Sequence, residues 1–234
     1  MKKVAVVGAK GFVGSQIAKA VVDSGKYELI PVVRGDPIEE LLAKADIIIH
    51  SANPARRWMA EQETAHDFDE TVEKTARLLT LSQGKRFVLI SSLSCRTQLY
   101  TNYGRHRRAC ELMALTRGAL VVRLGPMFEG ARRYDMLHDI LEGKEVFVSE
   151  DTCYAYASVV WVGHEVVELL EGPTTGIREI GACNSVRLGD IRDRFHTATK
   201  FWGRDETQVP EGCGYGPDAN DVFAFAKKEL TCGR

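Results

Sequence analysis

Short apolar runs alternate with amphipathic stretches along the first half of the chain. The apolar runs, rich in β-branched residues, predict buried strands over residues 3–7, 28–33, 46–50, 86–91 and 119–123. Between them, apolar positions recur at helical spacing and predict helices over residues 13–24, 37–44, 60–82 and 103–116. Strands and helices that alternate in this way build a parallel sheet with helices on both faces. The pattern therefore predicts an α/β fold with a doubly wound parallel sheet.

The first half of this sheet is predicted to be minimal. Only about a dozen residues separate Arg34 from Asp46, where a doubly wound sheet normally fits a further strand and helix. We therefore expect the outer strand of the first half to be missing. Pro31 is tolerated only near a sheet edge, so its strand is expected to lie there. The predicted strand order is 28–33, 3–7, 46–50, 86–91 and 119–123, with a late strand at 177–180 beside the last.

After Gly125-Pro126 the alternation becomes irregular. Helices are predicted near residues 133–142, 160–171 and 187–199, and the Gly-, Pro- and Asp-rich residues 203–220 are predicted to form a loop. We expect residues 1–125 to form one domain and residues 126–234 a small second lobe, with residues 177–180 returning to the sheet.

Composition and charge narrow the class of protein. The chain has 234 residues, of which 44% are hydrophobic, and can bury a full core. Its net charge of −1 gives no attraction to nucleic acid or membranes, and no apolar run approaches the roughly 20 residues of a membrane span. The first residues lead directly into a strand, and the six cysteines lack metal-site spacing. We therefore expect a cytoplasmic protein with no metal site and no nucleic-acid or membrane partner.

Gly8, Gly11 and Gly14 punctuate the turn between the first strand and the first helix. In a nucleotide-binding βαβ unit, the first glycine permits the tight turn and the second lets the backbone approach a pyrophosphate. The third lets the helix pack against the strand. The helix then presents its N–H groups and positive dipole end to the phosphates. Because the glycines lie between a strand and a helix, they predict a dinucleotide site, with an ordinary tight turn as the alternative.

The end of the second strand bears on the choice of dinucleotide. NAD-selective sites usually place an acid there, whereas a basic residue accommodates a 2′-phosphate. Arg34 follows this strand and Lys10 lies inside the glycine loop, so two cations predict NADP(H) rather than NAD(H). The alternative is that both are solvated surface charges. Asp36 is the competing acid and is expected to cap the next helix.

Residues 91–107 carry the candidate chemistry. A tyrosine exchanges a proton with a carbonyl or alcohol when a cation lowers its pKa from about 10. Arg107 lies at i+4 from Tyr103, on the same helix face. Ser92, with Ser94 as second candidate, follows the preceding strand and can hydrogen-bond the same substrate oxygen. The alternative for Tyr103 is a partly buried helix residue with its hydroxyl in water.

In combination, these motifs resemble the short-chain dehydrogenase/reductases, and within them the extended branch of NAD(P)-dependent nucleotide-sugar epimerases, dehydratases and reductases. The motifs are Gly8-x-x-Gly11-x-x-Gly14, Asp46-Ile-Ile-Ile-His50-Ser-Ala52, Ser91-Ser92, Tyr103-Gly-Arg-His-Arg-Arg-Ala-Cys-Glu111 and Val122-Arg123-Leu-Gly125-Pro126. The resemblance implies a Rossmann-like dinucleotide-binding domain over residues 1–125 and a substrate-binding lobe over residues 126–234. It also implies hydride transfer with a tyrosine as general acid/base.

The resemblance implies roles for individual residues. The candidate catalytic residues are Tyr103, Arg107, Ser92 and Ser94. The candidate cofactor-binding residues are Gly8, Lys10, Gly11, Phe12, Val13, Gly14, Arg34, Ser51, Ala52, Tyr103, Arg107 and Gly125. For a sugar-nucleotide pyrophosphate the candidates are Arg132 and Arg133. A homodimer packed through the helices at 60–82 and 103–116 is implied as well.

The sequence departs from the family pattern at two points, which bear on the type of reaction. Arg107 stands where the family has a lysine, and arginine is larger and planar. The interval from Ser92 to Tyr103 is also shorter than is usual in the extended branch. A reductase tolerates loss of that loop better than a dehydratase does. Three hypotheses stay open: an NADP(H)-dependent oxidoreductase or epimerase acting on a nucleotide sugar or keto-sugar, a reductase of another small carbonyl compound, and a non-catalytic dinucleotide-binding protein.

Overall fold

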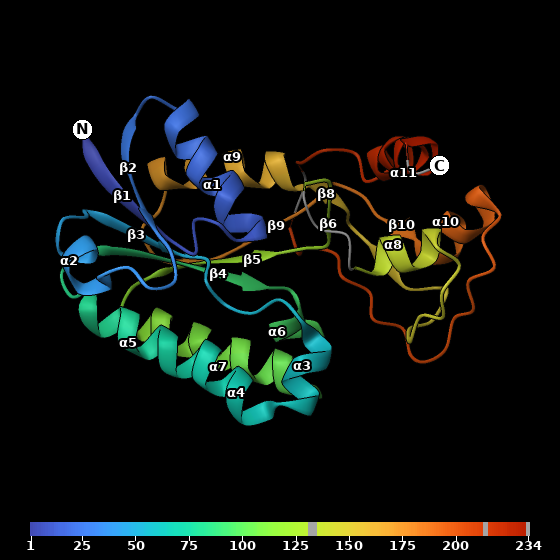
Figure 1. Cartoon of the computed structure of the whole chain (residues 1–234), viewed down its shortest axis with the longest axis horizontal. Helices are drawn as coiled ribbons and strands as arrows, with labels where there is room; N and C mark the ends of the chain where they lie inside the picture. Colours follow the sequence, from blue (N-terminus) through green and yellow to red (C-terminus); the bar gives the residue numbers. More distant parts are fainter. Residues whose placement is uncertain (131–134, 213–214, 233–234) are drawn as a thin grey trace. The chain divides into compact units, whose positions relative to one another are not determined.

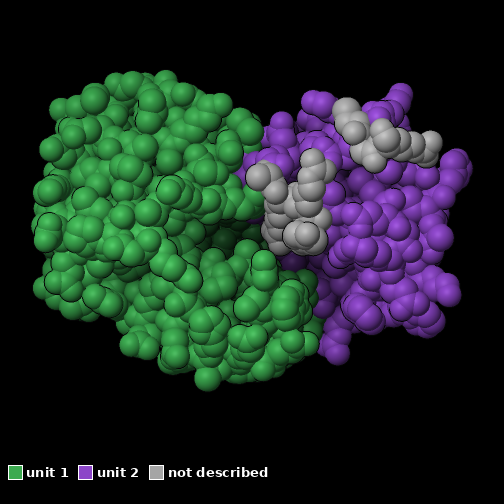
Figure 2. Space-filling view, in the orientation of Figure 1, with its two compact units in different colours: residues 1–124, 160–178 green, residues 125–159, 179–234 purple. Residues whose placement is uncertain are grey.

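A computed structural model describes residues 1–130, 135–212 and 215–232. The chain divides into two compact units, which Figure 2 colours separately. Unit 1 contains Met1–Leu124 and Val160–Arg178, and unit 2 contains Gly125–Val159 and Glu179–Arg234. Within the described residues, no helix is long and apolar enough to cross a membrane.

A six-stranded sheet forms the centre of unit 1, in the order β2-β1-β3-β4-β5-β9 (Figure 1). Its strands are β1 (Lys2–Val7), β2 (Tyr27–Val32), β3 (Ile47–His50), β4 (Arg86–Ser92), β5 (Leu120–Leu124) and β9 (Gly176–Ile180). All neighbours from β2 to β5 pair in parallel. Between β2 and β3 the chain forms only the short helix α2 (Ile38–Ala43). The predicted strand order and the missing outer strand are both confirmed. Pro31 lies on the edge strand β2, as expected.

Helices cover both faces of this sheet, which confirms the doubly wound fold. Figure 1 shows α1 (Phe12–Asp23) and α9 (Val159–Glu168) on one face, and α5 (Lys74–Leu81) and α7 (Asn102–Thr116) on the other. On the α5 and α7 face, apolar side chains of the strands and helices form one buried cluster, which includes Val7, Ile48, Leu78, Leu89, Ala114 and Val121. The helix η2 (Leu169–Glu171) continues α9 as a short 3-10 turn.

The helix predicted over residues 60–82 is not continuous. It begins as α3 (Arg57–Gln62) and resumes as α4 (Thr64–Phe68), a π-helical turn η1 (Asp69–Glu73) and α5. The break lies at Glu63, whose φ of −120° and ψ of 55° are not helical. The π-helical turn widens the helix, a feature that is frequent at functional sites.

Unit 2 has its own small sheets and apolar core. Strands β6 (Met127–Phe128) and β8 (Ala157–Ser158) pair in parallel, while β7 (Cys153–Tyr154) and β10 (Val186–Arg187) pair antiparallel. The helices are α8 (Met136–Leu141), α10 (Leu188–Phe195) and α11 (Asp221–Cys232). Helix α10 ends earlier than predicted because His196 adopts a left-handed φ of 52°. Helix α11 is not predicted from the sequence pattern.

Candidate functional site

Three glycines build a close-packed cradle after β1. Gly8 has a φ of 90°, and a Cβ there would lie 2.9 Å from both the Ala52 Cα and the Ser51 carbonyl oxygen. A Cβ on Gly14 would overlap the Gly8 carbonyl oxygen. The Gly11 N–H donates to that same oxygen at 2.8 Å and fixes the turn. The close packing at Gly8 and Gly14 thus has a steric reason, whereas the role of Gly11 toward a pyrophosphate stays a prediction.

The cradle lies at the carboxyl edge of the sheet. The Gly8 and Ala9 N–H groups both donate to the Val32 carbonyl oxygen, at 2.9 and 3.2 Å, which ties the loop to the end of β2. Phe12 and Val13 are half-buried and form the first turn of α1. The carboxyl edge is where open α/β sheets bind ligands, and a helix N-terminus beside glycines suits a phosphate.

Lys10 lies inside the cradle loop, and Arg34 lies two residues after Val32, to which the cradle is hydrogen-bonded. Lys10 is exposed in the glycine loop. The Arg34 side chain is 90% exposed, and its guanidinium lies 3.1 Å from a carboxylate oxygen of Glu70. The same oxygen lies 2.7 Å from the Lys74 ammonium, which also donates to the Ala52 carbonyl at 3.4 Å. Glu70 therefore pairs with two cations at the end of β2, a contact that the sequence pattern does not predict.

The expectation that Asp36 caps α2 is wrong. Its carboxylate accepts a hydrogen bond from the Val33 N–H at 2.8 Å and closes the turn after β2. The residue before α2 is Pro37, which makes no side-chain cap. Asp36 follows a tight turn, and the carboxylate satisfies the nearer backbone N–H instead.

The start of α7 packs tightly on the short helix α6 (Ser94–Thr97). Thr101 caps α7 by accepting a hydrogen bond from the Gly104 N–H at 2.9 Å. A Cβ on Gly104 would lie 2.8 Å from the Ser94 carbonyl oxygen and closer still to that of Gln98. Tyr103, in the first turn of α7, is consequently buried, with 7% of its surface exposed.

Arg107 joins α7 to the loop that follows β3. Its side chain is buried, with the guanidinium carbon 4.9 Å from the centre of the Tyr103 ring, and it donates a hydrogen bond to the Pro54 carbonyl oxygen. The Arg107 Nε is buried, and within the described residues no partner accepts a hydrogen bond from it. Buried polar atoms are normally paired, so this edge fits a polar ligand. The cradle and this unpaired donor together fit a dinucleotide.

The two candidate serines lie together at the end of β4. Ser92 is the last residue of the strand, and its hydroxyl oxygen accepts a hydrogen bond from the Ser94 N–H at 3.2 Å. The Ser92 hydroxyl also donates to the Ser94 hydroxyl at 3.3 Å. Since α6 contacts α7, the serines and Tyr103 belong to neighbouring elements of unit 1.

The buried carboxylate of Glu111 connects β4, α6, α7 and β5. Glu111 of α7 has no exposed surface and accepts hydrogen bonds from Ser91 at 2.7 Å, Cys95 at 2.8 Å and Arg123 at 2.9 and 2.7 Å. Burial alone would raise the pKa of Glu111, but the hydrogen bonds from Arg123, Cys95 and Ser91 outweigh it and hold that pKa below its usual value. The sequence signal for this cluster is Arg123, a charge inside a buried apolar strand.

Gly125, the remaining predicted cofactor residue, is the first residue of unit 2. The Gly125 N–H donates to the Ile180 carbonyl at 3.0 Å, after the end of β5. Arg132 and Arg133 lie outside the described residues. In the described parts of the chain, no three His, Cys, Asp or Glu side chains are grouped as metal ligands.

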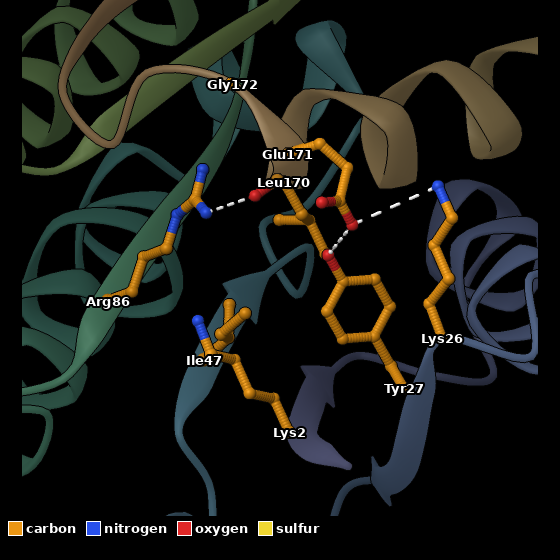
Figure 3. A pocket seen from close by; sticks show the side chains of 8 residues that line it. All are labelled: Lys2, Lys26, Tyr27, Ile47, Arg86, Leu170, Glu171 and Gly172. Atoms are coloured by element: carbon orange, nitrogen blue, oxygen red, sulfur yellow. Dashed lines mark hydrogen bonds and ion pairs between the residues drawn. The ribbon is translucent and has the colours of Figure 1, made fainter.

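A pocket of about 510 Å³ opens at the amino ends of the strands (Figure 3). The Tyr27 hydroxyl donates to Glu171 at 2.6 Å, and burial, followed by this hydrogen bond, raises the pKa of Tyr27 to about 12. Arg86 donates to the carbonyl oxygens of Leu169 and Leu170 and so caps the C-terminus of η2. Tyr27, Lys26 and Arg86 thus contact Glu171 or the carbonyl oxygens of η2, and ligands of open α/β sheets bind at the opposite edge. The side chains that line this pocket therefore attach α9 and η2 to the sheet.

The glycine cradle at the carboxyl edge of this parallel sheet defines a Rossmann-like fold. Residues 4–105 match the model of the NAD dependent epimerase/dehydratase family, which confirms the family resemblance over that range. No curated protein matches the chain.

Solved structures of nucleotide-sugar enzymes share this fold. One is UDP-glucuronic acid 4-epimerase from Bacillus cereus in complex with UDP-glucuronic acid and NAD, with a TM-score of 0.74 and 15% identity over 96% of this chain and 93% of that one. A second is UDP-N-acetylglucosamine 4-epimerase from Methanobrevibacter ruminantium in complex with UDP-N-acetylmuramic acid, with a TM-score of 0.76 and 12% identity over 98% and 97%. A third is dTDP-4-dehydrorhamnose reductase from Bacillus anthracis in complex with NADP, with a TM-score of 0.69 and 16% identity over 93% and 88%. At these identities the likeness establishes the fold.

Proposed function

We propose that the chain is an NADP(H)-dependent oxidoreductase or epimerase of the short-chain dehydrogenase/reductase type, acting on a nucleotide sugar or keto-sugar. The observation that carries this proposal is the position of the loop at residues 51–54. On one side its backbone lies against Gly8 of the glycine cradle, and on the other its Pro54 carbonyl accepts a hydrogen bond from Arg107. One loop thus joins the proposed dinucleotide site to the helix that carries Tyr103.

The proposed cofactor is a nicotinamide dinucleotide, which donates or accepts a hydride when bound. Gly8, Gly11 and Gly14 leave room for its pyrophosphate at the N-terminus of α1. Arg34 at the end of β2 and Lys10 in the glycine loop support NADP(H) over NAD(H). The other residues assigned to the cofactor are Phe12, Val13, Ser51, Ala52, Tyr103, Arg107 and Gly125.

The chain's own residues supply proton transfer and positioning. Tyr103 is assigned as the general acid/base that exchanges a proton with the substrate oxygen. Ser92 is assigned to hold that oxygen, with Ser94 positioned by the hydrogen bond between the two hydroxyls. Arg107 is assigned to the nicotinamide ribose, which its unpaired Nε supports. Its guanidinium lies beside the tyrosine ring.

The substrate class is proposed from the family resemblance and from the nucleotide sugars held by the solved relatives. Residues 126–234 are proposed as the substrate lobe, with Arg132 and Arg133 contacting the pyrophosphate of the substrate. The short interval between Ser92 and Tyr103 leaves little room for a loop bearing a further acid, so a reductase or epimerase is favoured over a dehydratase.

We also propose a homodimer packed through the outer faces of α4, α5 and α7. Phe68 on α4 is 46% exposed and Leu112 on α7 is 51% exposed, which supports an apolar contact there. Light scattering on the purified chain measures the mass directly, and the mass of a single chain would contradict the dimer.

A non-catalytic dinucleotide-binding protein is the second candidate. The observation that favours it is the engagement of Arg107, whose guanidinium lies over the Tyr103 ring and donates to the Pro54 carbonyl. A guanidinium held in this way replaces the family's lysine without reproducing its shape. On this reading the cradle binds cofactor, but no hydride transfer follows.

The test is NADPH oxidation with a panel of nucleotide 4-keto-sugars, monitored by the absorbance of reduced nicotinamide. Tyr103→Phe is expected to lower kcat by about 10²-fold or more, because the proton donor is removed. Its NADPH affinity should stay within about twofold of the wild type, because phenylalanine keeps the aromatic ring and only the hydroxyl is lost. Tyr100→Phe is the matched control, since Tyr100 is exposed just before the same helix, and it should turn over normally.

Arg107 separates the two candidate functions. Arg107→Lys should retain or raise turnover, and Arg107→Ala should weaken both NADPH binding and kcat. Unchanged turnover in Tyr103→Phe would show that the assigned mechanism is wrong. Binding of NADPH with no turnover of any carbonyl substrate, in the wild type and in Arg107→Lys alike, would favour the non-catalytic protein.

A further inference from the structure

One carboxylate is shared by two cations at the end of β2. A single oxygen of Glu70 lies 3.1 Å from the Arg34 guanidinium and 2.7 Å from the Lys74 ammonium. The Glu70 and Lys74 side chains are each 27% exposed, while that of Arg34 is 90% exposed. The partly buried pair is therefore the fixed part of this group, and Arg34 is the part that can exchange partners.

This group lies at the same corner as the glycine cradle. Lys74 donates to the Ala52 carbonyl oxygen, and the Ala52 backbone lies against Gly8. Glu70 reaches the corner from the π-helical turn η1. The cradle itself is hydrogen-bonded to Val32, two residues before Arg34. Parallel α/β sheets place the adenosine ribose of a dinucleotide at this strand end.

The charge of the group depends on Glu70. The hydrogen bond from Lys74 comes first among the effects that hold the pKa of Glu70 below its usual value, and the charge of Arg34 adds to it. The ionised carboxylate thus offsets one of the two positive charges and competes for Arg34 with any phosphate bound at the corner.

We propose that Glu70 is a specificity-determining residue of the dinucleotide site. By holding Arg34, Glu70 limits the preference of this site for a dinucleotide that carries a 2′-phosphate. The inference rests on the proposed function, because it requires that a dinucleotide binds at the glycine cradle. Removing the charge of Glu70 frees Arg34 to pair with the phosphate. NADH lacks the 2′-phosphate, so the same change gives NADH no new contact.

The test is calorimetric titration of NADPH and NADH into the full chain and its variants. Glu70→Gln should tighten NADPH binding at least about fivefold, with NADH affinity within about twofold of the wild type. The gain should disappear in Arg34→Ala/Glu70→Gln relative to Arg34→Ala, because Arg34 is the group released. Glu39→Gln is the matched control, since it removes a carboxylate from an exposed ion pair with Arg77 elsewhere on unit 1. It should change neither affinity.

A second variant covers the case in which Glu70→Gln does not fold. Glu70→Asp keeps the charge but shortens the reach to Arg34, and it should shift the NADPH-to-NADH ratio in the same direction by a smaller factor. If a dinucleotide still binds to the Glu70 variant, but the NADPH-to-NADH affinity ratio falls or stays within twofold of the wild-type ratio, the proposed role of Glu70 is overturned. The proposed function is untouched by that result. Failure of the wild type to bind either dinucleotide overturns the proposed function itself.

Discussion

His50 ends β3 as a fully buried side chain and fixes the loop that follows it. Its Nδ1 accepts a hydrogen bond from the Ala52 N–H at 3.3 Å, and its Nε2 lies 3.1 Å from the Thr75 hydroxyl. Burial, and then the positive charges of Arg107 and Lys74, lower the pKa of His50 to about 3. The imidazole is therefore neutral near pH 7. Its acceptor nitrogen holds the backbone that contacts the glycine cradle.

This histidine predicts a pH dependence of stability. Between its ordinary pKa of 6.5 and the folded value of about 3, the unfolded chain binds a proton that the folded chain does not. The stabilisation is complete above pH 6.5 and is lost as the pH falls toward 3. We expect the excess free energy of unfolding of the wild type over His50→Asn to shrink by about 2 kcal/mol between pH 7 and pH 5.

Urea denaturation at both pH values measures this difference. A constant or growing difference for His50→Asn would show that the imidazole titrates normally in the folded chain.

At the scale of elements, the sequence pattern predicts the sheet well because each strand carries a local signal. Buried β-branched runs identify β1, β3, β4 and β5, and Pro31 identifies β2 as the edge. The break at Glu63 carries no comparable signal. Helix α11 does carry one, since its buried residues Val222 and Ala226 are four apart, but it follows a Gly-, Pro- and Asp-rich segment and was not predicted.

In the candidate site, too, features that depend on neighbouring residues could be predicted, and contacts between distant elements could not. The glycine positions and the pair Tyr103 and Arg107 could be predicted from spacing, because turns and i+4 neighbours are local. The partners of Arg34 and Arg123 could not, since Glu70 and Glu111 come from other elements. Long side chains choose among several partners, and only the folded chain decides which carboxylate is near.

The cluster around Glu111 joins β4, α6, α7 and β5, the elements that carry or support Ser92, Ser94 and Tyr103. Glu111→Gln leaves the buried charge of Arg123 without a carboxylate. We expect this variant to lower the free energy of unfolding by about 3–5 kcal/mol, as measured by urea denaturation. Glu39→Gln, in an exposed pair, should change it by about 0.5 kcal/mol or less. A loss below about 1 kcal/mol for Glu111→Gln would show that the cluster does not hold these elements together.

At the scale of the whole molecule, the central claim is that unit 1 holds a nicotinamide dinucleotide at the glycine cradle. Everything else in the proposed function, from the role of Tyr103 to the substrate lobe, depends on that binding. One glycine of the cradle provides a control variant for dinucleotide binding. A Cβ on Gly14 would overlap the Gly8 carbonyl oxygen, so Gly14→Ala should displace α1 and remove the phosphate site.

The most direct measurement is calorimetric titration of NADPH and NADH into the wild type and Gly14→Ala, with circular dichroism to check that the variant is folded. We predict that the wild type binds both dinucleotides and binds NADPH at least tenfold more tightly, about 1.4 kcal/mol, because of Arg34 and Lys10. A folded Gly14→Ala should bind neither at comparable concentration. A wild type that binds neither dinucleotide, or a folded Gly14→Ala that binds both as well as the wild type does, would contradict the claim.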